Sequence, residues 1–348
     1  MLSPTKFRDI VSGRQAGLLA ASLRVLLRLA EFPYSWAMRL RNCWYDRALA
    51  ESHSVDARVI SIGNLTLGGT GKTPLVQWIG RRLQRQEVRF AIVSRGYRAA
   101  PAGVNDEALE LQLALPDVPH HQDRDRVAAA REVIKQYRSQ VILLDDGFQH
   151  RRLARDLDVV LLDATEPFGF DHVFPRGTLR EPLAGLSRAD VVVLSRADML
   201  DKTARRQVRD RVARLAPDVL WCEIVHGPDE LINTQGATSP TSTLAGKRVA
   251  AFSGIGNPAG FRHTLATLDC ELIAWREYPD HHHYTSEDME SLAEWAVGAD
   301  LVLCTRKDLV KLHHAALGRV PLWAVSVELR FLAGQELLES ALDQLMAS

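Results

Sequence analysis

The residues between Val59 and Pro74 have the types and the spacing needed to bind a phosphate group. An apolar, β-branched run at 59–62 predicts a buried strand, and a helical pattern begins just after the glycines that follow. Glycines let backbone N–H groups wrap a phosphate, and a helix N-terminus adds partial positive charge. Lys72 would then reach the β- and γ-phosphates of a nucleotide, and the Thr73 hydroxyl would bind Mg²⁺. The nucleotide-binding residues predicted from this pattern are Gly68, Gly69, Thr70, Gly71, Lys72 and Thr73.

One position departs from the strict phosphate-loop pattern G-x-x-x-x-G-K-[ST]. Thr66 stands where the pattern has its first glycine. The alternative interpretation is a glycine-rich turn that carries a surface lysine. We favour the phosphate loop because Gly71-Lys72-Thr73 lies directly between an apolar strand and a helix, which is the structural context that the motif requires.

Two carboxylates follow a second apolar run. Residues 141–144 predict a buried strand, and Asp145 and Asp146 come directly after it. Such a strand places carboxylates at its C-terminal end, beside the phosphate loop, where they can bind Mg²⁺ directly or through water. A charged turn after a core strand is the alternative, and the phosphate loop upstream favours the metal site.

Two polar segments could act on an acceptor or a proton, and each also has a structural explanation. Gln149 and His150 follow the two carboxylates and either position a phosphate or acceptor or simply begin a loop. Asp106 and Glu107 lie in a loop after the second strand, where a carboxylate could accept the proton of an attacking hydroxyl. An acidic pair in a loop is more often a solvated turn or a helix cap.

Two further segments are equally open. Arg176 and Arg180 lie in a loop rich in Gly and Pro and either bind an anion or are surface charge. The segment 279–284 contains Asp280 and three consecutive histidines, His281, His282 and His283. A metal site, a catalytic histidine oriented by a carboxylate and a solvated loop are the three interpretations. From the residues alone, the solvated loop comes first.

The order of apolar and helical segments predicts an α/β fold. Strands at 88–93, 158–163 and 190–194 and helices at 73–86 and 124–137 alternate around the segments above, which implies a parallel sheet flanked by helices. The pattern restarts after a tract rich in Gly, Pro, Ser and Thr at 227–246. We therefore expect a nucleotide-binding domain at 51–226, a smaller α/β domain at 227–330 and a C-terminal helix at 331–348. Segments 219–225 and 322–329 are expected to pair as a ribbon that joins the two domains.

The first fifty residues differ in character from the rest of the chain. They contain an excess of basic residues, and 16–50 predicts a helix with leucines on one side and aromatic residues interleaved with arginines. This combination is typical of a helix lying in a membrane interface. A helix packed on the domain with a solvated basic face is the alternative. Apolar runs here are too interrupted for a membrane span or a signal peptide.

Composition limits the remaining function classes. The formal net charge is zero, which gives no support to a nucleic-acid partner. Four scattered cysteines without a C-x-x-C pair fit reduced thiols in a cytosolic compartment. Segments 195–198 and 305–308 faintly match the [NT]-K-x-D base-reading motif, although neither has lysine in its second position. A P-loop GTPase or an ATP-dependent binding or assembly protein is therefore the alternative function.

Taken together, the motifs resemble those of one family, the tetraacyldisaccharide 4′-kinases of lipid A biosynthesis. The matching segments occur in family order across most of the chain, and they are 62–74, 94–97, 106–107, 145–150, 179–182, 254–258 and 279–281. The family's phosphate loop has the same shape at Thr66. Asn105, Phe174, Arg176 and Thr178 depart from the family pattern, which affects the expected shape of the acceptor pocket.

The resemblance implies transfer of phosphate from ATP, with Mg²⁺, to the 4′-hydroxyl of a tetraacylated glucosamine disaccharide 1-phosphate. It implies Lys72 and Asp106 as catalytic residues, Asp106 being paired with a histidine of the 281–283 run, of which His281 is our choice. It implies that Thr73, Asp145 and Asp146 bind the metal. It also implies a peripheral protein on the cytoplasmic face of a bacterial inner membrane, and no obligate protein partner is evident. Substrate binding is expected from Asn64, Glu107, Gln149, His150 and Arg180.

Overall fold

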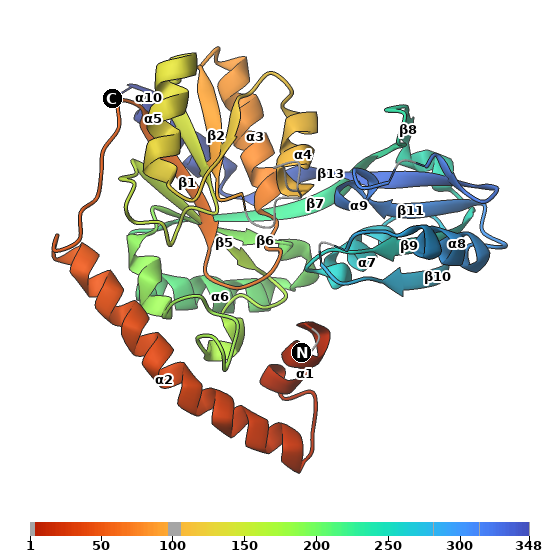
Figure 1. Cartoon of the computed structure of the whole chain (residues 1–348), viewed down its shortest axis with the longest axis horizontal. Helices are drawn as coiled ribbons and strands as arrows, with labels where there is room; N and C mark the ends of the chain where they lie inside the picture. The colour runs from red at the N-terminus through yellow and green to blue at the C-terminus, as the bar shows by residue number, and fades with distance from the viewer. Residues whose placement is uncertain (1–3, 97–105, 281, 313, 348) are drawn as a thin grey trace.

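The computed structural model describes residues 4–96, 106–280, 282–312 and 314–347, and these form one continuous sheet covered by helices (Figure 1). The sheet has thirteen strands in these residues, in the order β10-β9-β11-β13-β7-β6-β5-β1-β4-β2-β3, with β8 beside β7 and β12 beside β13. The prediction of an α/β fold with a mostly parallel sheet flanked by helices is confirmed.

The first half of the sheet contains the predicted nucleotide-binding segments. Its neighbouring strands all run parallel, which places their C-terminal ends at one edge. The strands are β1 (Arg58–Asn64), β2 (Phe90–Ser94), β3 (His120–Gln122), β4 (Val141–Asp145), β5 (Leu157–Asp163), β6 (Val191–Ser195) and the start of β7 (Leu220–Ile232).

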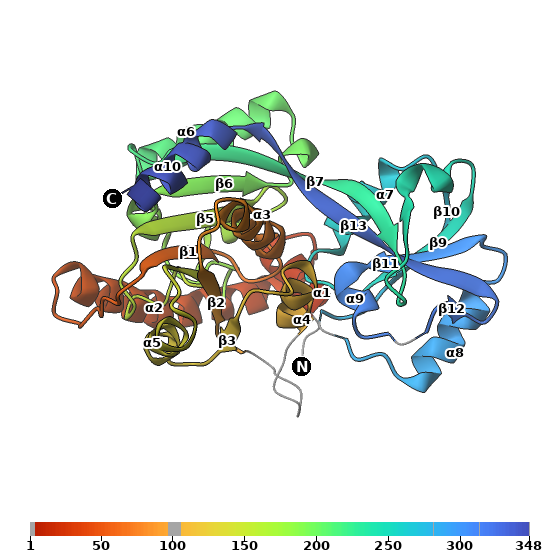
Figure 2. The same ribbon diagram turned by 90° about the horizontal axis from the view of Figure 1, so that it is seen from above.

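The second half repeats the parallel arrangement on a smaller scale. Its strands are β9 (Arg248–Ser253), β10 (Glu271–Glu277), β11 (Leu301–Thr305) and β13 (Val320–Ala333), with short additions β8 (Thr238–Pro240) and β12 (Ala316–Leu317). Strands β7 and β13 are antiparallel to each other and run from one half into the other (Figure 2). The predicted ribbon is therefore present, and it is longer than expected.

The helices cover both faces of the first half because alternate strand residues point to opposite sides. One apolar cluster joins β1 and β4 to α3 (Lys72–Arg85), α4 (Asp106–Ala114) and α10 (Gln335–Ala347). Clusters on the other face include α5 (Arg126–Tyr137) and α6 (Lys202–Leu215). In the second half, α8 (Ser286–Trp295) and α9 (Arg306–Leu309) lie opposite α7 (Pro258–Ala266).

Several predicted bounds differ from the structure. The boundary that we placed at 227 falls inside β7, because the antiparallel pairing with β13 continues through the glycine and proline found there. The C-terminal segment begins as the end of β13, and its helix starts only at Gln335. Helix α6 was not expected, because half of its residues are charged and only Val208 and Val212 are buried.

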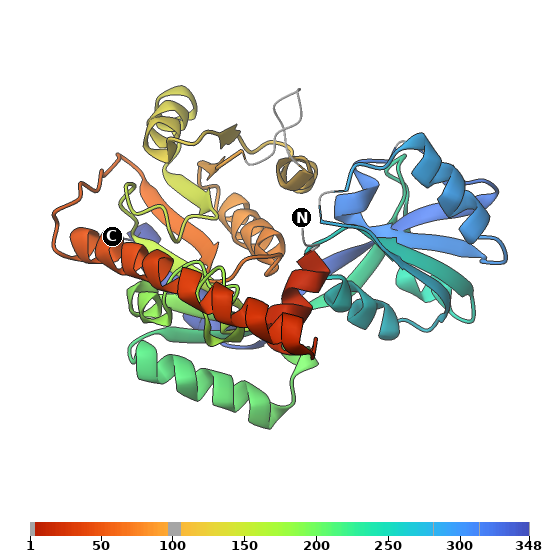
Figure 3. The same cartoon turned by 60° about the horizontal axis from the view of Figure 1, so that its bottom comes forward.

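The N-terminal segment forms two helices, α1 (Pro4–Ser12) and α2 (Leu18–Asp46), and α2 lies along the outside of the first half (Figures 1 and 3). Polar side chains of α2 face the protein: Glu31 accepts a hydrogen bond from the Val173 N–H at 2.8 Å, and Asn42 Nδ2 donates to Glu181 Oε2 at 2.7 Å. The apolar side faces outward and exposes Leu18, Leu19, Val25, Leu26, Leu29, Phe32, Trp36, Leu40 and Trp44. Helix α2 is therefore packed on the domain, as the alternative interpretation expected, but its outward side is mainly apolar and also carries exposed arginines such as Arg39.

No helix in the part of the chain that the structure describes is both long and apolar enough to cross a membrane.

Candidate active site

The phosphate loop connects β1 to α3 in the conformation that its glycines allow. Gly68 and Gly71 have φ of 113° and 82°, in the left-handed region that side chains with a Cβ rarely adopt. A Cβ at Gly71 would also lie 2.4 Å from Cε1 of His226, on β7. Glycine is therefore required at this position for two independent reasons.

Side chains from neighbouring strands bind the carbonyl groups of the loop. Asn64 Nδ2 donates to the Thr66 carbonyl at 2.8 Å, and Ser195 Oγ donates to the Thr70 carbonyl at 2.7 Å. Arg196 Nη2 donates to the Gly69 carbonyl at 3.1 Å. These contacts fix the loop in one shape before a ligand arrives.

The predicted lysine and carboxylates meet at the edge of the sheet. Strand β4 pairs with β1 so that Asp145 lies opposite Ile62, and Asp146 follows it. Lys72 Nζ lies 3.3 Å from Asp146 Oδ1, and Arg180 Nη1 lies 2.8 Å from both carboxylate oxygens of Asp146. Burial by itself would raise the pKa of Asp146, but the charges of Lys72 and Arg180 outweigh it and lower that pKa well below its usual range. Asp146 is therefore ionised at neutral pH.

The donor set at this edge fits Mg²⁺. Thr73, Asp145 and Asp146 carry hydroxyl and carboxylate oxygens, the type of ligand that this ion prefers, and would hold it. No group of three or more His, Cys, Asp or Glu side chains that could hold a metal occurs among the residues described. Proteins usually bind Mg²⁺ through one or two carboxylates together with substrate phosphates.

The predicted acceptor residues occupy different environments. Gln149 lies beside the carboxylates, where its Nε2 donates to the Asn64 carbonyl at 2.9 Å and its Oε1 accepts from Arg180 at 3.4 Å. Asn64 itself is fully buried. His150 is turned toward Arg126, whose Nη1 lies 3.2 Å from Nδ1. Burial and the charge of Arg126 lower the pKa of His150 to about 4, so this imidazole is neutral at physiological pH.

The predicted proton-accepting pair is described only in part. Asp106 is the first residue of α4, and Glu107 follows it in the same helix. His281 lies outside the described residues. Its neighbour Asp280 is close to the phosphate loop, because a Cβ at Gly256 would lie 2.9 Å from Asp280 Oδ2 and 2.8 Å from the Gly69 nitrogen.

The contacts of His282 lie within the second half of the molecule. Its Nε2 lies 2.9 Å from Asp288 Oδ2, and its ring stacks on Tyr278 with centroids 4.6 Å apart. Asp288 belongs to the capping box of α8.

Residues that the sequence analysis did not select connect the second half of the molecule to the phosphate loop. Asn257 Nδ2, at the start of α7, donates to Asp163 Oδ2 at 2.8 Å and lies 3.2 Å from Thr165 Oγ1. The same Asp163 oxygen accepts from Arg196 Nη1 at 2.5 Å, and Arg196 also contacts the loop at Gly69. The sequence contained a signal for each of them: Asp163 and Arg196 lie at or just after the C-terminal ends of parallel strands, and Asn257 lies in the family-like segment 254–258.

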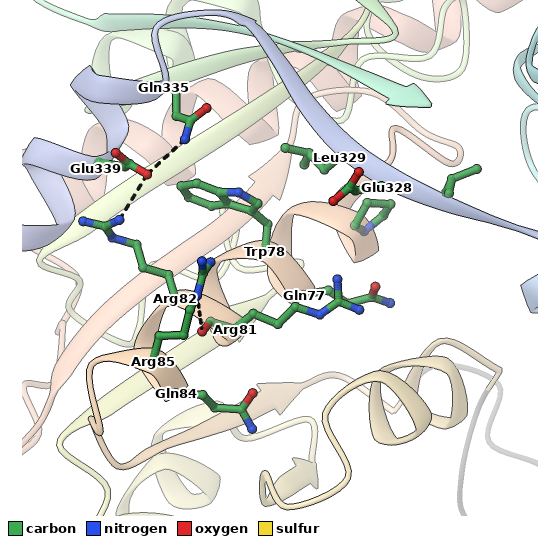
Figure 4. Close-up of a pocket in the computed structure, with 12 residues that line it drawn as sticks. Gln77, Trp78, Arg81, Arg82, Gln84, Arg85, Glu328, Leu329, Gln335 and Glu339 are labelled. Carbon is green, nitrogen blue, oxygen red and sulfur yellow. Dashed lines mark hydrogen bonds and ion pairs between the residues drawn. The ribbon is translucent and has the colours of Figure 1, made fainter. Parts of the chain in front are cut away.

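A large open cavity lies elsewhere, between α3, β13 and α10 (Figure 4). Its volume is about 690 Å³, and Trp78, Arg81 and Arg82 are among its lining residues. Arg82 and Gln335 both contact Glu339 at its wall. None of the predicted site residues lines this cavity, although Pro74, which directly follows the phosphate loop, does.

The geometry above agrees with comparisons to known proteins. A family model described as tetraacyldisaccharide-1-P 4′-kinase matches residues 23–347. The chain belongs to this family. A tetraacyldisaccharide 4′-kinase of Anaeromyxobacter sp. (strain K) is 39% identical over 95% of this chain and 93% of that protein. The corresponding protein of Geobacter sulfurreducens is 34% identical over 98% of both chains.

A solved structure shows the same similarity in three dimensions. LpxK from Aquifex aeolicus, crystallised in complex with ATP, has a TM-score of 0.72 and 26% identity and covers 93% of this chain and 99% of its own. The sequence-based identification of the family is confirmed, and with it the prediction of an ATP-dependent kinase. These comparisons do not support the alternative, a GTPase or an assembly protein, better than they support the kinase.

Proposed function

We propose that this kinase transfers the γ-phosphate of ATP to the 4′-hydroxyl of a tetraacylated glucosamine disaccharide 1-phosphate and so forms lipid IVA. The observation that carries the proposal is the convergence of Lys72 and Arg180 on Asp146 beside the phosphate loop. Family membership supplies the class of acceptor. Positioning and electrostatic stabilisation account for most of the catalysis in reactions of this type.

In the proposed reaction the 4′-oxygen forms a bond to the γ-phosphorus, and the bond from that phosphorus to the β–γ bridging oxygen breaks. ADP leaves, and the proton of the hydroxyl passes to Asp106. Lys72 stabilises the charge on the β- and γ-phosphates. Mg²⁺, bound by Thr73, Asp145 and Asp146, would neutralise phosphate charge when present.

We assign the support of Asp106 to a histidine of the second half, and His281 remains our choice. The position of Asp280 beside the phosphate loop supports it, and the contacts of His282 with Asp288 and Tyr278 make His282 a weaker candidate. Arg180 and Gln149 are proposed to orient the acceptor at the same edge. Glu107 and His150 complete the proposed acceptor side, and Asn64 acts there by shaping the loop.

We also propose that α2 lies on the cytoplasmic surface of the inner membrane. Its outward apolar side and exposed arginines such as Arg28 and Arg39 suit an anionic lipid surface. The acyl chains of the substrate could then stay in the bilayer while the sugar reaches the site. This arrangement supports a peripheral enzyme that acts on a lipid.

The direct test is incubation with ATP, Mg²⁺ and the tetraacyl disaccharide 1-phosphate, followed by mass spectrometry of the lipid. We expect one added phosphate on the distal glucosamine. Lys72→Met is the matched control, because it removes the charge at the phosphates and keeps a side chain of similar length. A lipid that remains unmodified with the wild-type protein, or one that is phosphorylated equally by the variant, would reject the proposal.

A further inference from the structure

Helix α1 brings a charged side chain from the N-terminal segment to the phosphate loop. Ile10 and Val11 of this helix are buried, and Arg176 Nη1 donates to the Val11 carbonyl at 2.8 Å. Phe7 packs near Phe174, with ring centroids 6.4 Å apart. Figure 3 shows α1 beside the start of α2. The helix therefore has a defined place next to the site.

Arg8 is the side chain that reaches the loop. Its Nη2 lies 2.6 Å from the position that a Cβ would occupy at Gly68, where φ is 113°. The absence of a side chain at Gly68 thus leaves room for this guanidinium. Any L-residue at position 68 would displace Arg8 as well as strain the loop.

Within the described part of the chain, Arg8 differs from Lys72, Arg180 and Arg196 in having no carboxylate partner. Lys72 and Arg180 pair with Asp146, and Arg196 pairs with Asp163. Among the described residues, no hydrogen bond or ion pair of Arg8 occurs. Glu166 is a nearby acid: burial raises its pKa, and Arg8 acts in the opposite direction from too far away to form a pair. A guanidinium without a partner beside a phosphate loop is available to an anionic ligand.

We propose that Arg8 contacts the γ-phosphoryl group during transfer and stabilises the charge on its equatorial oxygens. This inference rests on nucleotide binding at the phosphate loop. A guanidinium presents several N–H donors in a rigid plane, which matches phosphate oxygens better than an ammonium group does. Phosphate-loop enzymes use arginines in this way, supplied either by the same chain or by a partner. Here the arginine comes from the same chain.

Arg8 lies in the chain before the residues that match the family model. The matched family model begins at residue 23, so Arg8 lies outside the part of the chain that defines the family. Helix α1 is tied to α2 through Arg24, whose Nη1 donates to the Ile10 carbonyl at 3.3 Å and to the Gln15 carbonyl at 3.1 Å. The segment that we place at the membrane would therefore also complete the active site.

The test compares ground-state and transition-state analogues in the full-length protein. Affinities for Mg²⁺–ADP alone and for Mg²⁺–ADP with aluminium fluoride are measured by calorimetry in wild type, Arg8→Ala, Arg8→Lys and Arg14→Ala. Arg14 is exposed in the same segment, and its variant is the control for charge. We expect the affinity of Arg8→Ala for Mg²⁺–ADP to be within about threefold of wild type. The increase in affinity that aluminium fluoride causes should be smaller by about tenfold or more in this variant, and kcat should fall by about 100-fold or more.

The outcomes separate the two proposals. Arg8→Lys should recover little, because a single ammonium group does not replace the planar guanidinium. An Arg8→Ala variant that gains as much from aluminium fluoride as wild type does would overturn the role of Arg8, and so would an equal loss in Arg14→Ala. Failure of the wild-type protein to bind Mg²⁺–ADP would instead contradict nucleotide binding at the loop. Equal melting temperatures show that the variants are folded.

Discussion

Asp146 is the residue at which the two sides of the site meet. It contacts Lys72 from the phosphate loop and Arg180 from a distant loop, and it is held in a left-handed backbone conformation with φ of 54°. A non-glycine residue in that region is uncommon, and such conformations concentrate at functional sites. The strain is consistent with a carboxylate that must point at both cations.

The proposed proton transfer makes a prediction at the same scale. Asp106→Ala should reduce kcat by about 100-fold or more and leave the ATP affinity nearly unchanged, because a general base acts on the transition state and not on nucleotide binding. Steady-state kinetics with the lipid acceptor and calorimetry with ATP measure the two effects. Near-normal turnover in Asp106→Ala would exclude it as the base.

Single asparagine variants of His281, His282 and His283 distinguish the candidate partners. The largest loss of kcat is expected at His281, and a loss of thermal stability is expected at His282 because of its contact with Asp288. His283 is exposed and serves as the matched control. If His283→Asn lost activity while His281→Asn kept it, our assignment would be wrong.

At the scale of elements, α2 is unusual because its apolar side faces outward. Leu29 and Phe32 are 61% and 63% exposed, and burying side chains of this size in an apolar environment stabilises by roughly 1.5–3 kcal/mol each. A free aqueous surface gives no reason for such a row of side chains. A lipid surface does.

Replacing both residues by glutamate, Leu29→Glu with Phe32→Glu, should therefore weaken binding to anionic vesicles by about tenfold or more and leave the melting temperature unchanged. Flotation with vesicles of phosphatidylglycerol and phosphatidylethanolamine measures the binding. Val297→Glu is the control, because Val297 is 78% exposed but lies in the second half. Equal flotation of the double variant and wild type would contradict the membrane role of α2.

At the scale of the whole molecule, polar contacts around the phosphate loop join the two halves in addition to the β7–β13 ribbon. Asn257 has two functions there. Its Nδ2 donates to Asp163, and its Oδ1 accepts from the Gly260 N–H at 3.0 Å and so caps α7. The cap of α7 and this contact between the two halves thus share one side chain.

Asn257→Asp separates these functions, since a carboxylate still caps the helix but is repelled by Asp163. We expect kcat/KM to fall by about tenfold or more with little change in the melting temperature, because like charges in close contact cost several kcal/mol. Asn233→Asp is the matched control: Asn233 also accepts backbone hydrogen bonds, but in a turn remote from the loop. Equal kinetics for both variants would show that the Asn257 contact has no role in assembling the site.

Three histidines make the stability of the whole molecule sensitive to acid. Burial lowers the pKa values of His120 and His150 to about 4 and of His226 to about 3, against 6.5 for an unperturbed histidine. In this window the unfolded chain binds more protons than the folded chain does. The contribution of these three neutral histidines to the free energy of unfolding is therefore fully present above about pH 6.5. It is lost as the pH decreases toward 4.

Urea unfolding at pH 7 and pH 5 tests this. The His120→Gln variant should lose less stability between the two pH values than wild type does, by roughly 1 kcal/mol. Carboxylates titrate in both proteins, so the difference isolates the histidine. Identical losses would show that His120 is not buried as a neutral group in solution.

The sequence by itself determined the chemistry and its order along the chain. The phosphate loop, the carboxylates after β4 and the alternation of strands and helices are local patterns, because glycine conformation, side-chain periodicity and charge can be read from neighbouring residues. Those patterns were sufficient to predict the fold class. They also placed most strands and helices within a few residues of their observed bounds.

Only the tertiary structure decided which side chains meet. The contacts of Arg180 with Asp146, of Asn257 with Asp163 and of Arg8 with Gly68 join segments far apart in the chain, and no local pattern encodes them. The same holds for α2, whose pattern predicts an apolar side but not the direction in which it faces. That direction is set by polar groups such as the backbone N–H of Val173 and the carboxylate of Glu181, which the folded sheet brings beside the helix.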